Sequence, residues 1–133
     1  MTEASNQTPG AGRVGTLSRQ VISALNLPIK NEAPIYLGET NIDHMKRRHP
    51  ADYAKYGQHV RLILSDPDYV GVNPKDDSIE YVKEFQLNGE YVKVAVRVSV
   101  SGNYFVRSLY LLNTNRVNNF ISKGSLKPLD KSQ

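Results

Sequence analysis

A short basic segment combines side chains that can move protons with side chains that can bind phosphate. Its sequence is Asn41-Ile-Asp-His-Met-Lys-Arg-Arg-His-Pro50. Histidine is the usual proton carrier near neutral pH, so His44 and His49 are candidates for a general acid and a general base. The cations Lys46, Arg47 and Arg48 between them would attract a polyanion. Such a set of residue types suits the metal-free cleavage of RNA.

That reaction requires a base for the 2′-hydroxyl, an acid for the leaving 5′-oxygen and cations for the charge that develops on phosphorus. We expect His44 and His49 to be the acid and the base, and Arg97 with Lys46 to neutralise the phosphate. No expected strand carries Asp or Glu at the spacing of a metal cluster, which argues against a two-metal nuclease and favours a reaction without a cofactor.

Helices are expected in the first half of the chain. The histidine-bearing helix should begin near Thr40 or Asn41 and end at His49, because proline disfavours helical backbone in the residue before it. Its His44, Arg47 and Arg48 then share one face. The other expected elements are a helix that runs from Thr16 as N-cap to Pro28, a strand at Ile35–Leu37, a helix across Tyr53–Leu64 and a last short helix that ends at Gly124.

The hydrophobic period changes to two in the C-terminal half. Valines alternate with polar or small residues from Val92 to Val100, which is typical of a strand with one buried face. Asn88-Gly89 before it and Ser101-Gly102 after it each suit a two-residue hairpin loop. Such loops would pair Phe85 with Val92, Tyr81 with Val96, Val94 with Leu109 and Val98 with Phe105. Because this register places apolar residues on one common face, it predicts a three-stranded antiparallel meander.

The opposite face of the meander is expected to be polar and to hold the rest of the site. Its members are Glu80, Glu84, Lys93, Arg97, Ser108 and Tyr110. Ser108 and Tyr110 would present their hydroxyl groups side by side, and Glu80 would lie across from Arg97, with Glu84 across from Lys93. Arg107 instead falls on the apolar face in this register. Either its strand carries a bulge or Arg107 has a structural role.

Each of these features also has a purely structural interpretation. A basic helix face is most often simply solvated. Cross-strand ion pairs explain Glu80 with Arg97 and Glu84 with Lys93 adequately. His49 can be only an N-cap or loop residue before Pro50, and a structural role is favoured for His59.

Composition sets wider bounds on the chain. With 133 residues, 39% hydrophobic and 23% charged, it should form one domain over residues 16–133, after a disordered tail at residues 1–15 that is rich in small polar residues. The net charge of +4 is compatible with a nucleic-acid partner. There is no cysteine, which excludes disulfides and thiolate metal sites. The first residues do not resemble a signal peptide, so we expect a location in the cytoplasm or with a phage particle.

Several short motifs, taken in order, resemble those of the phage Barnase–EndoU–colicin–RelE-like nuclease family. The resemblance covers about residues 35–124. The motifs are Ile35-Tyr-Leu-Gly38, His44-Met-Lys-Arg-Arg-His-Pro50, Pro67-Asp-Tyr-Val-Gly71, Ser78-Ile-Glu-Tyr81, Val94-Ala-Val-Arg97 and Arg107-Ser-Leu-Tyr110.

This resemblance implies an α+β fold in which N-terminal helices pack on a small antiparallel sheet. It also implies a toxin-like, cofactor-free RNA-cleaving activity of phage or mobile-element origin. By position, the resemblance and the face pattern assign the catalytic roles to His44, Lys46, His49, Arg97, Ser108 and Tyr110. Substrate binding is expected from Arg47, Arg48, Lys93 and Arg107. An immunity or antitoxin protein is the partner that such an activity would require.

Three functions remain open from the sequence. The first is an endoribonuclease, acting on tRNA or another structured RNA. The second is a non-catalytic module of a phage particle or mobile element that binds RNA or a protein. The third, a DNA-binding regulator, is disfavoured because the sequence shows no helix-turn-helix or ribbon motif.

Overall fold

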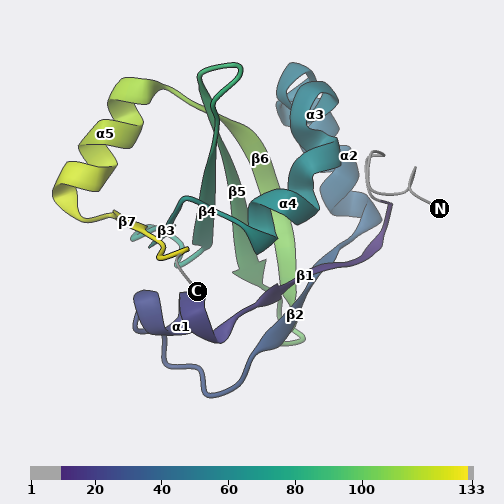
Figure 1. The fold of residues 1–133 in the computed structure, drawn as a ribbon. Coiled ribbons are helices and arrows are strands. Elements are labelled where there is room, and N and C mark those ends of the chain that lie inside the picture. Colours follow the sequence, from purple (N-terminus) through teal and green to yellow (C-terminus); the bar gives the residue numbers. More distant parts are fainter. Residues whose placement is uncertain (1–9, 132–133) are drawn as a thin grey trace.

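The computed structural model describes residues 10–131, which form seven strands and five α-helices (Figure 1). The strands are β1 Gly12–Leu17, β2 Ala33–Leu37, β3 Tyr69–Val72, β4 Ile79–Phe85, β5 Glu90–Val98, β6 Tyr104–Leu112 and β7 Leu126–Pro128. The helices are α1 Arg19–Ala24, α2 Glu39–Arg48, α3 Pro50–Tyr56, α4 Val60–Ser65 and α5 Thr114–Lys123. None of these helices is long and apolar enough to cross a membrane.

All seven strands join one sheet in the order β1-β2-β6-β5-β4-β3-β7. Neighbouring strands are antiparallel except β2 and β6, which run parallel and pair only at Ile35 with Tyr104 and Tyr36 with Phe105. The α+β class is therefore confirmed, with the predicted meander β4–β5–β6 at its centre. The expectation that helices form the N-terminus is wrong, because β1 comes first in the described chain and α2, α3 and α4 lie between β2 and β3.

Strand β1 differs from the sequence prediction at both of its ends. Its residues 12–15 fall inside the expected tail, yet they pair with β2, and Leu17 is fully buried. The helix that follows is capped by Ser18 and not by Thr16, because the Ser18 Oγ accepts a hydrogen bond from Val21 N at 3.2 Å. A short edge strand with two glycines has too little alternation to be recognised without its partner. Residues 1–9 of the expected tail lie outside the described residues.

The first hairpin of the meander has a longer loop than the sequence suggests. Residues 86–89 form a four-residue turn in which Asn88 N donates to Phe85 O at 3.0 Å, and Gly89 has a φ of 63°. Tyr81 consequently pairs with Val94 instead of Val96. A shift of two residues leaves every side chain on its predicted face, which is why the hydrophobic pattern does not distinguish the two registers.

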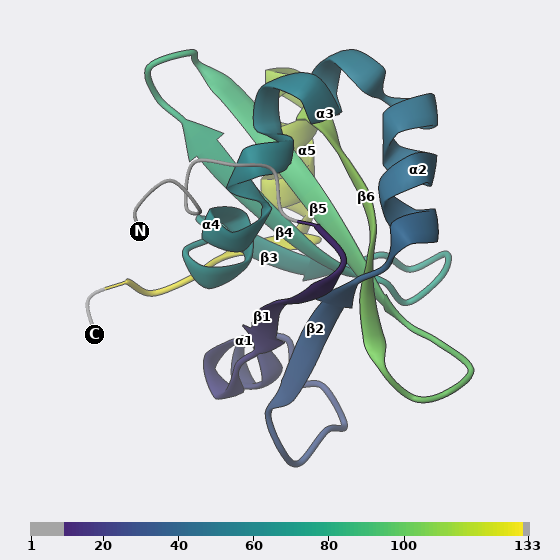
Figure 2. The same cartoon turned by 90° about the vertical axis from the view of Figure 1, so that its right-hand side faces the viewer.

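Helices cover both faces of the central strands (Figures 1 and 2). Helices α3 and α4 bury the apolar face, where Val60 and Ile63 pack against the valines of β5. The predicted helix across 53–64 is divided by a 3-10 turn at Gly57–His59. Helix α5 lies on the other face and packs Val117 against Val82 and Leu112. It ends at Gly124 in the left-handed conformation, as predicted.

Helix α2 stands beside β6, at the point where β2 has left that strand (Figure 2). Its buried residue is Met45, which is 1% exposed and belongs to the main core cluster. The neighbouring α3 satisfies part of the free edge of β6, because Asp52 Oδ2 accepts a hydrogen bond from Leu111 N at 3.1 Å. The edge of the sheet is thus closed by helices where no strand covers it.

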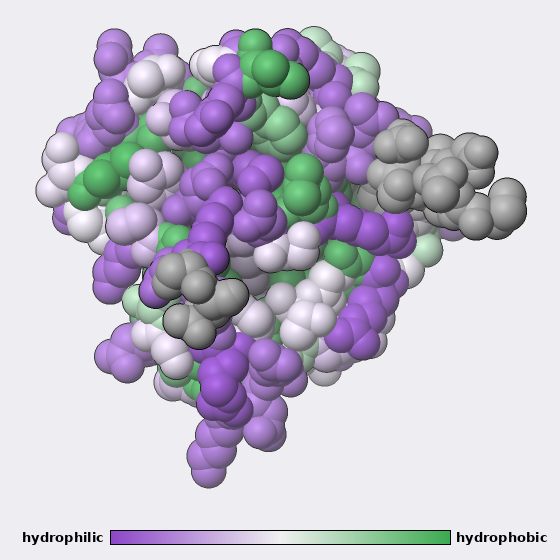
Figure 3. Space-filling view, viewed as in Figure 1, coloured by the Kyte–Doolittle hydropathy of each residue, from purple (hydrophilic) through white to green (hydrophobic). Residues whose placement is uncertain are grey.

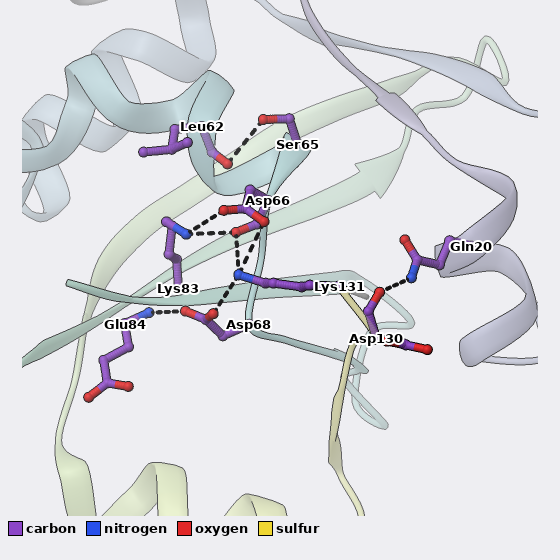
Figure 4. A network of polar contacts seen from close by, with 9 residues as sticks. All are labelled: Gln20, Leu62, Ser65, Asp66, Asp68, Lys83, Glu84, Asp130 and Lys131. Atoms are coloured by element: carbon purple, nitrogen blue, oxygen red, sulfur yellow. Dashed lines mark hydrogen bonds and ion pairs between the residues drawn. The ribbon is translucent and has the colours of Figure 1, made fainter. Parts of the chain in front are cut away.

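The C-terminal segment is fastened to the opposite edge of the sheet. Strand β7 pairs with β3, and Lys131 Nζ reaches Asp66 Oδ1 at 3.1 Å and Asp68 Oδ1 at 2.6 Å (Figure 4). Lys83 Nζ contacts Asp66 from β4 at 3.0 Å. We call these four residues the C-terminal clasp. It joins the tail, the loop after α4 and strand β4.

Candidate active site

Helix α2 directs one stripe of side chains toward β6. The helix begins after Gly38, whose backbone N–H donates to Asn41 Oδ1 at 3.1 Å. Met45 points into the core, which fixes the rotation of the helix. His44 and the residues one turn before and after it, Asn41 and Arg47, therefore lie along the open side of β6. The basic side chains of the last turn also face the negative end of the helix dipole, which favours cations there.

A bulge in β6 decides which of its side chains face α2. Ala95 pairs with Ser108, whereas the next residue, Val96, pairs with Val106, so that Arg107 is the extra residue between them. Val96 and Val106 are both fully buried. The side chains of Arg107 and Ser108 therefore both point away from the core. Of the two explanations that the sequence left open for Arg107, a bulge in its strand or a structural role, the structure shows the bulge.

The bulge also corrects the expected position of Phe105. The uninterrupted register paired Phe105 with Val98 on the apolar face. In the structure Phe105 pairs with Arg97 and shares the polar side with it. Sequence alternation could not reveal this change, because a single inserted residue reverses the faces of everything beyond it.

The side chains from α2 and the sheet meet around a cleft of about 490 Å³. It is the first of two adjoining hollows, and we call it the arginine cleft. Three guanidinium groups and one imidazole face it, together with an aromatic ring. Its lining residues are Thr40, Asn41, His44, Arg47, Arg97, Val98, Ser99, Phe105 and Arg107.

A second hollow of about 360 Å³ lies on the other side of His44, and we call it the histidine hollow. Its lining residues are His44, Met45, Arg48, His49, Ser108 and Tyr110. The His49 ring stacks on the Tyr110 ring, with centroids 4.8 Å apart and planes inclined by 24°. His44 is common to both hollows, so the helix and the polar side of the sheet meet as the sequence analysis expected.

Beneath Tyr110 lies a buried ion pair. Lys93 Nζ and Glu80 Oε2 are 2.8 Å apart, with their side chains 8% and 11% exposed. The ammonium also lies 4.9 Å from the centroid of the Tyr110 ring. Burial lowers the pKa of Lys93, but contacts with Glu80 and Tyr110 outweigh it, so the pKa is raised above its ordinary value. Lys93 is thus held away from the open surface.

The predicted cross-strand ion pairs are wrong because of the two-residue shift in the first hairpin. Glu80 pairs in the ladder with Ala95 and not with Arg97, and Glu84 pairs with Tyr91 and not with Lys93. Glu80 instead binds Lys93 diagonally and accepts a second hydrogen bond from Asn73 Nδ2 at 3.3 Å. Arg97 is thereby left to line the arginine cleft.

Asp76 is an acidic neighbour that the sequence analysis missed. It lies in the loop between β3 and β4, where Ser78 donates to Asp76 Oδ1 from its hydroxyl at 2.7 Å and from its backbone at 3.0 Å. These hydrogen bonds, with the charges of Arg97 and Arg107, keep the pKa of Asp76 below its ordinary value. An Asp two residues before a Ser is a common loop pattern, so nothing in the sequence links Asp76 to the arginines.

Two other residues that the sequence suggested for the site, Lys46 and His59, lie outside the two hollows. Lys46 is exposed and lines two other hollows, next to Asp43 in one and next to Pro50 in the other, and Arg97 lines neither of them. His59 contacts the rings of Tyr56 and Phe85, at centroid distances of 6.1 and 5.3 Å, on a different part of the surface. Neither joins His44 and His49 in the two hollows.

The assembled groups can transfer protons and bind anions. Two imidazoles and two hydroxyl-bearing side chains line the histidine hollow, and guanidinium groups line the cleft beside it. In residues 10–131, no group of three or more His, Asp or Glu side chains is arranged to hold a metal ion.

Residues 12–119 match the sequence model of a family described as phage-Barnase-EndoU-ColicinE5/D-RelE like nuclease 3. This range begins at β1 and reaches into α5, so it includes every residue of both hollows. No curated protein and no solved structure matches the chain significantly.

Proposed function

The chain belongs to the phage Barnase–EndoU–colicin–RelE-like nucleases, and from this premise we propose that it is an endoribonuclease that works without a metal. The family membership confirms the resemblance in the sequence motifs, and it makes the chain a member of a nuclease family. RNA as the substrate, the mechanism and the toxin-like role are our proposals.

The observation that supports the proposal best is the position of His44 between the two hollows. On one side lie the guanidinium groups of Arg97 and Arg107, and on the other lie His49 and Ser108. A phosphodiester bound beside His44, where the two hollows meet, would have guanidinium groups on one side and the second imidazole, that of His49, on the other. This is the set of groups that in-line transfer of a phosphoryl group needs.

In the proposed reaction one histidine, as its neutral form, removes the proton of the 2′-hydroxyl as that oxygen attacks phosphorus. The other, as its imidazolium, gives its proton to the 5′-oxygen as the P–O5′ bond breaks. The products are a 2′,3′-cyclic phosphate and a free 5′-hydroxyl. Arg97 and Arg107 neutralise the additional charge on the phosphate oxygens in the transition state. The hydroxyl groups of Ser108 and Tyr110 donate hydrogen bonds to the same phosphate oxygens.

The biological role we propose is that of a toxin of phage or mobile-element origin. An RNA-cleaving protein endangers the cell that makes it, so an immunity or antitoxin protein is the expected partner. The exposed cations of α2 would suit an acidic surface on that partner.

The proposal is tested by incubating the purified protein with total cellular RNA in the presence of a chelator. We expect cleavage with cyclic phosphate ends. His44→Ala and His49→Ala should each lower the rate at least about a hundredfold, because each removes one proton-transfer group. His59→Ala is the matched control, since His59 lies outside both hollows, and it should leave the rate unchanged.

The dependence of kcat/KM on pH provides a second measurement. The native protein should give a bell-shaped profile. His44→Ala and His49→Ala should each lose one limb of that profile. Intact RNA at high protein concentration, or equal rates in all three variants, would contradict the proposal and favour a non-catalytic module.

A further inference from the structure

The arginine cleft contains an aromatic ring that the proposed chemistry does not use. Phe105 is half-buried and lines this cleft from the tip of β6. Its ring lies 5.8 Å from that of Tyr36, at an inclination of 42°, so the ring of its ladder partner in β2 packs beside it. The β6 bulge places Phe105 on the polar side, where an apolar ring gains least from burial.

The surroundings of Phe105 are strongly cationic. Arg97 is its partner across the ladder, Arg107 follows two residues later, and Arg47 faces them from α2. No Asp or Glu belongs to the residues that line this cleft. The carboxylate of Asp76, near the two strand arginines, offsets only one of the three guanidinium charges. The cleft therefore keeps a net positive charge beside a ring that can stack.

An amide at the edge of the cleft has a fixed orientation. Asn41 Oδ1 accepts the backbone N–H of Gly38 at 3.1 Å, which commits the oxygen of that amide and leaves its Nδ2 group as the donor. Thr40, one residue earlier, adds a hydroxyl. Polar groups held in one direction can distinguish the hydrogen-bonding edges of nucleobases.

We propose that the arginine cleft is the subsite for one unpaired nucleotide next to the cleaved linkage. Phe105 stacks on the base, Arg97 and Arg107 bind the cleaved phosphate that is attached to this nucleotide, and Asn41 Nδ2 donates to an acceptor on the base edge. The inference rests on the proposed function and deepens it, because it requires the RNA to be single-stranded at the site of cleavage. Aromatic stacking beside a cationic groove is how proteins hold single-stranded nucleic acid.

Binding is measured with short fluorescein-labelled 2′-O-methyl oligonucleotides of each base, which have no free 2′-hydroxyl and so are not cleaved. Phe105→Leu keeps an apolar side chain and removes the ring, and it should weaken binding about tenfold, as the loss of one stacked base does. Phe105→Tyr restores a ring and should bind within about twofold of the native protein. Phe85→Leu is the matched control, because Phe85 lies with Tyr56 and His59 away from the cleft.

The salt dependence of the same binding separates stacking from charge. Arg107→Gln should reduce the slope of log affinity against log salt by about 0.7, the value for one phosphate contact on a single strand. Phe105→Leu should shift the line without changing its slope. Far-UV circular dichroism and thermal melting establish that each variant is folded.

The outcome for the subsite is independent of the outcome for catalysis. His49→Ala should lose cleavage of RNA and still bind the uncleavable probe, because His49 does not line the arginine cleft, so failure of the catalytic proposal alone leaves the binding result intact. Cleavage of a hairpin RNA should map to its loop and spare its stem. Equal affinity of folded Phe105→Leu and native protein, or equal binding of duplex and single strand, would overturn the inference.

Discussion

Lys93 and Glu80 are the two charged residues buried in the described chain. Their ion pair lies under Tyr110, and the Tyr110 ring in turn stacks on His49. A charge taken out of water needs a close partner to offset its lost hydration, and here the partner is the Glu80 carboxylate. The pair therefore supports the floor of the histidine hollow.

Removal of one member of this pair should be far more damaging than removal of both. Glu80→Gln leaves the Lys93 ammonium buried without a counter-charge, and we expect it to lower the free energy of unfolding by about 3–5 kcal/mol. The double variant Glu80→Gln with Lys93→Met should recover a large part of that loss. Urea denaturation of the native protein and the variants measures this, and a double variant no more stable than Glu80→Gln would contradict the argument.

At the scale of single residues, residue type in the sequence was enough to select several side chains that the structure brings together at the candidate site. His44, His49 and Arg97 do line the two hollows, as the sequence analysis expected. Lys46 does not, because residue type gives no direction on the helix surface. Phe105 was missed, since an aromatic residue in a strand is most simply interpreted as core.

Among the elements, β6 carries the bulge that shapes the arginine cleft, and this bulge allows a direct test of the register. Deletion of Arg107 would bring Val106 directly next to Ser108. The existing pairs of Val96 with Val106 and of Ala95 with Ser108 then become one regular ladder. The deletion removes a guanidinium group without turning any buried valine outward.

We therefore expect the protein that lacks Arg107 to fold and unfold cooperatively, with weaker binding of RNA. Deletion of Val94, in the regular part of β5, is the control. It reverses the faces of every residue on one side of the deletion and should abolish folding. Circular dichroism and thermal melting compare the two, and an unfolded protein after deletion of Arg107 would contradict the assigned register.

The elements that the sequence predicted well are those whose pattern is local. The alternating valines predicted the central strand, although β5 ends at Val98 and not at Val100, and Gly124 predicted the end of α5. Strand β1 and the four-residue turn at 86–89 were not predicted, because each is decided by a partner strand. The bulge likewise depends on how two strands pair, and no single segment contains that information.

On the scale of the whole molecule, the C-terminal clasp holds the far edge of the sheet. Hydrogen bonding to Lys83, and then to Lys131, outweighs partial burial and lowers the pKa of Asp66. Burial lowers the pKa of Lys131, but its contacts with Asp68 and Asp66 outweigh this and raise it. The carboxylate contribution is present above the ordinary pKa of 3.8 and is lost as pH falls further. The ammonium contribution is present below 10.5 and is lost as pH rises through the raised pKa.

Lys131→Met should accordingly lower the melting temperature at intermediate pH and have little effect in strong acid, where the carboxylates are protonated. The effect should be small, below about 1 kcal/mol, because Lys131 and Asp66 are 37% and 50% exposed and water screens their attraction. Lys127→Met, in β7, is the control, because no ion pair of Lys127 occurs in residues 10–131. Thermal melting at several pH values tests this, and an equal effect of Lys131→Met at about pH 2 and pH 7 would contradict it.

The exposed apolar side chains of the described residues lie at a few separate points on the surface. Leu62 and Leu87 lie near α4 and the first hairpin, and Val98 and Val100 lie near the second. On the face viewed in Figure 3, hydrophilic residues cover most of the area and hydrophobic ones form small, scattered patches. Scattered apolar residues of this kind are ordinary on a protein surface.

Met45 has a consequence for how the two hollows adapt to different ligands. It is the one buried side chain of α2, and it is long and unbranched, with three rotatable side-chain bonds. Such an anchor can follow a small sliding of the helix without opening a void, whereas a branched residue would resist it. Replacement of Met45 by a stiffer, branched side chain is therefore expected to hold α2, and with it the helix side of both hollows, more rigidly against β6.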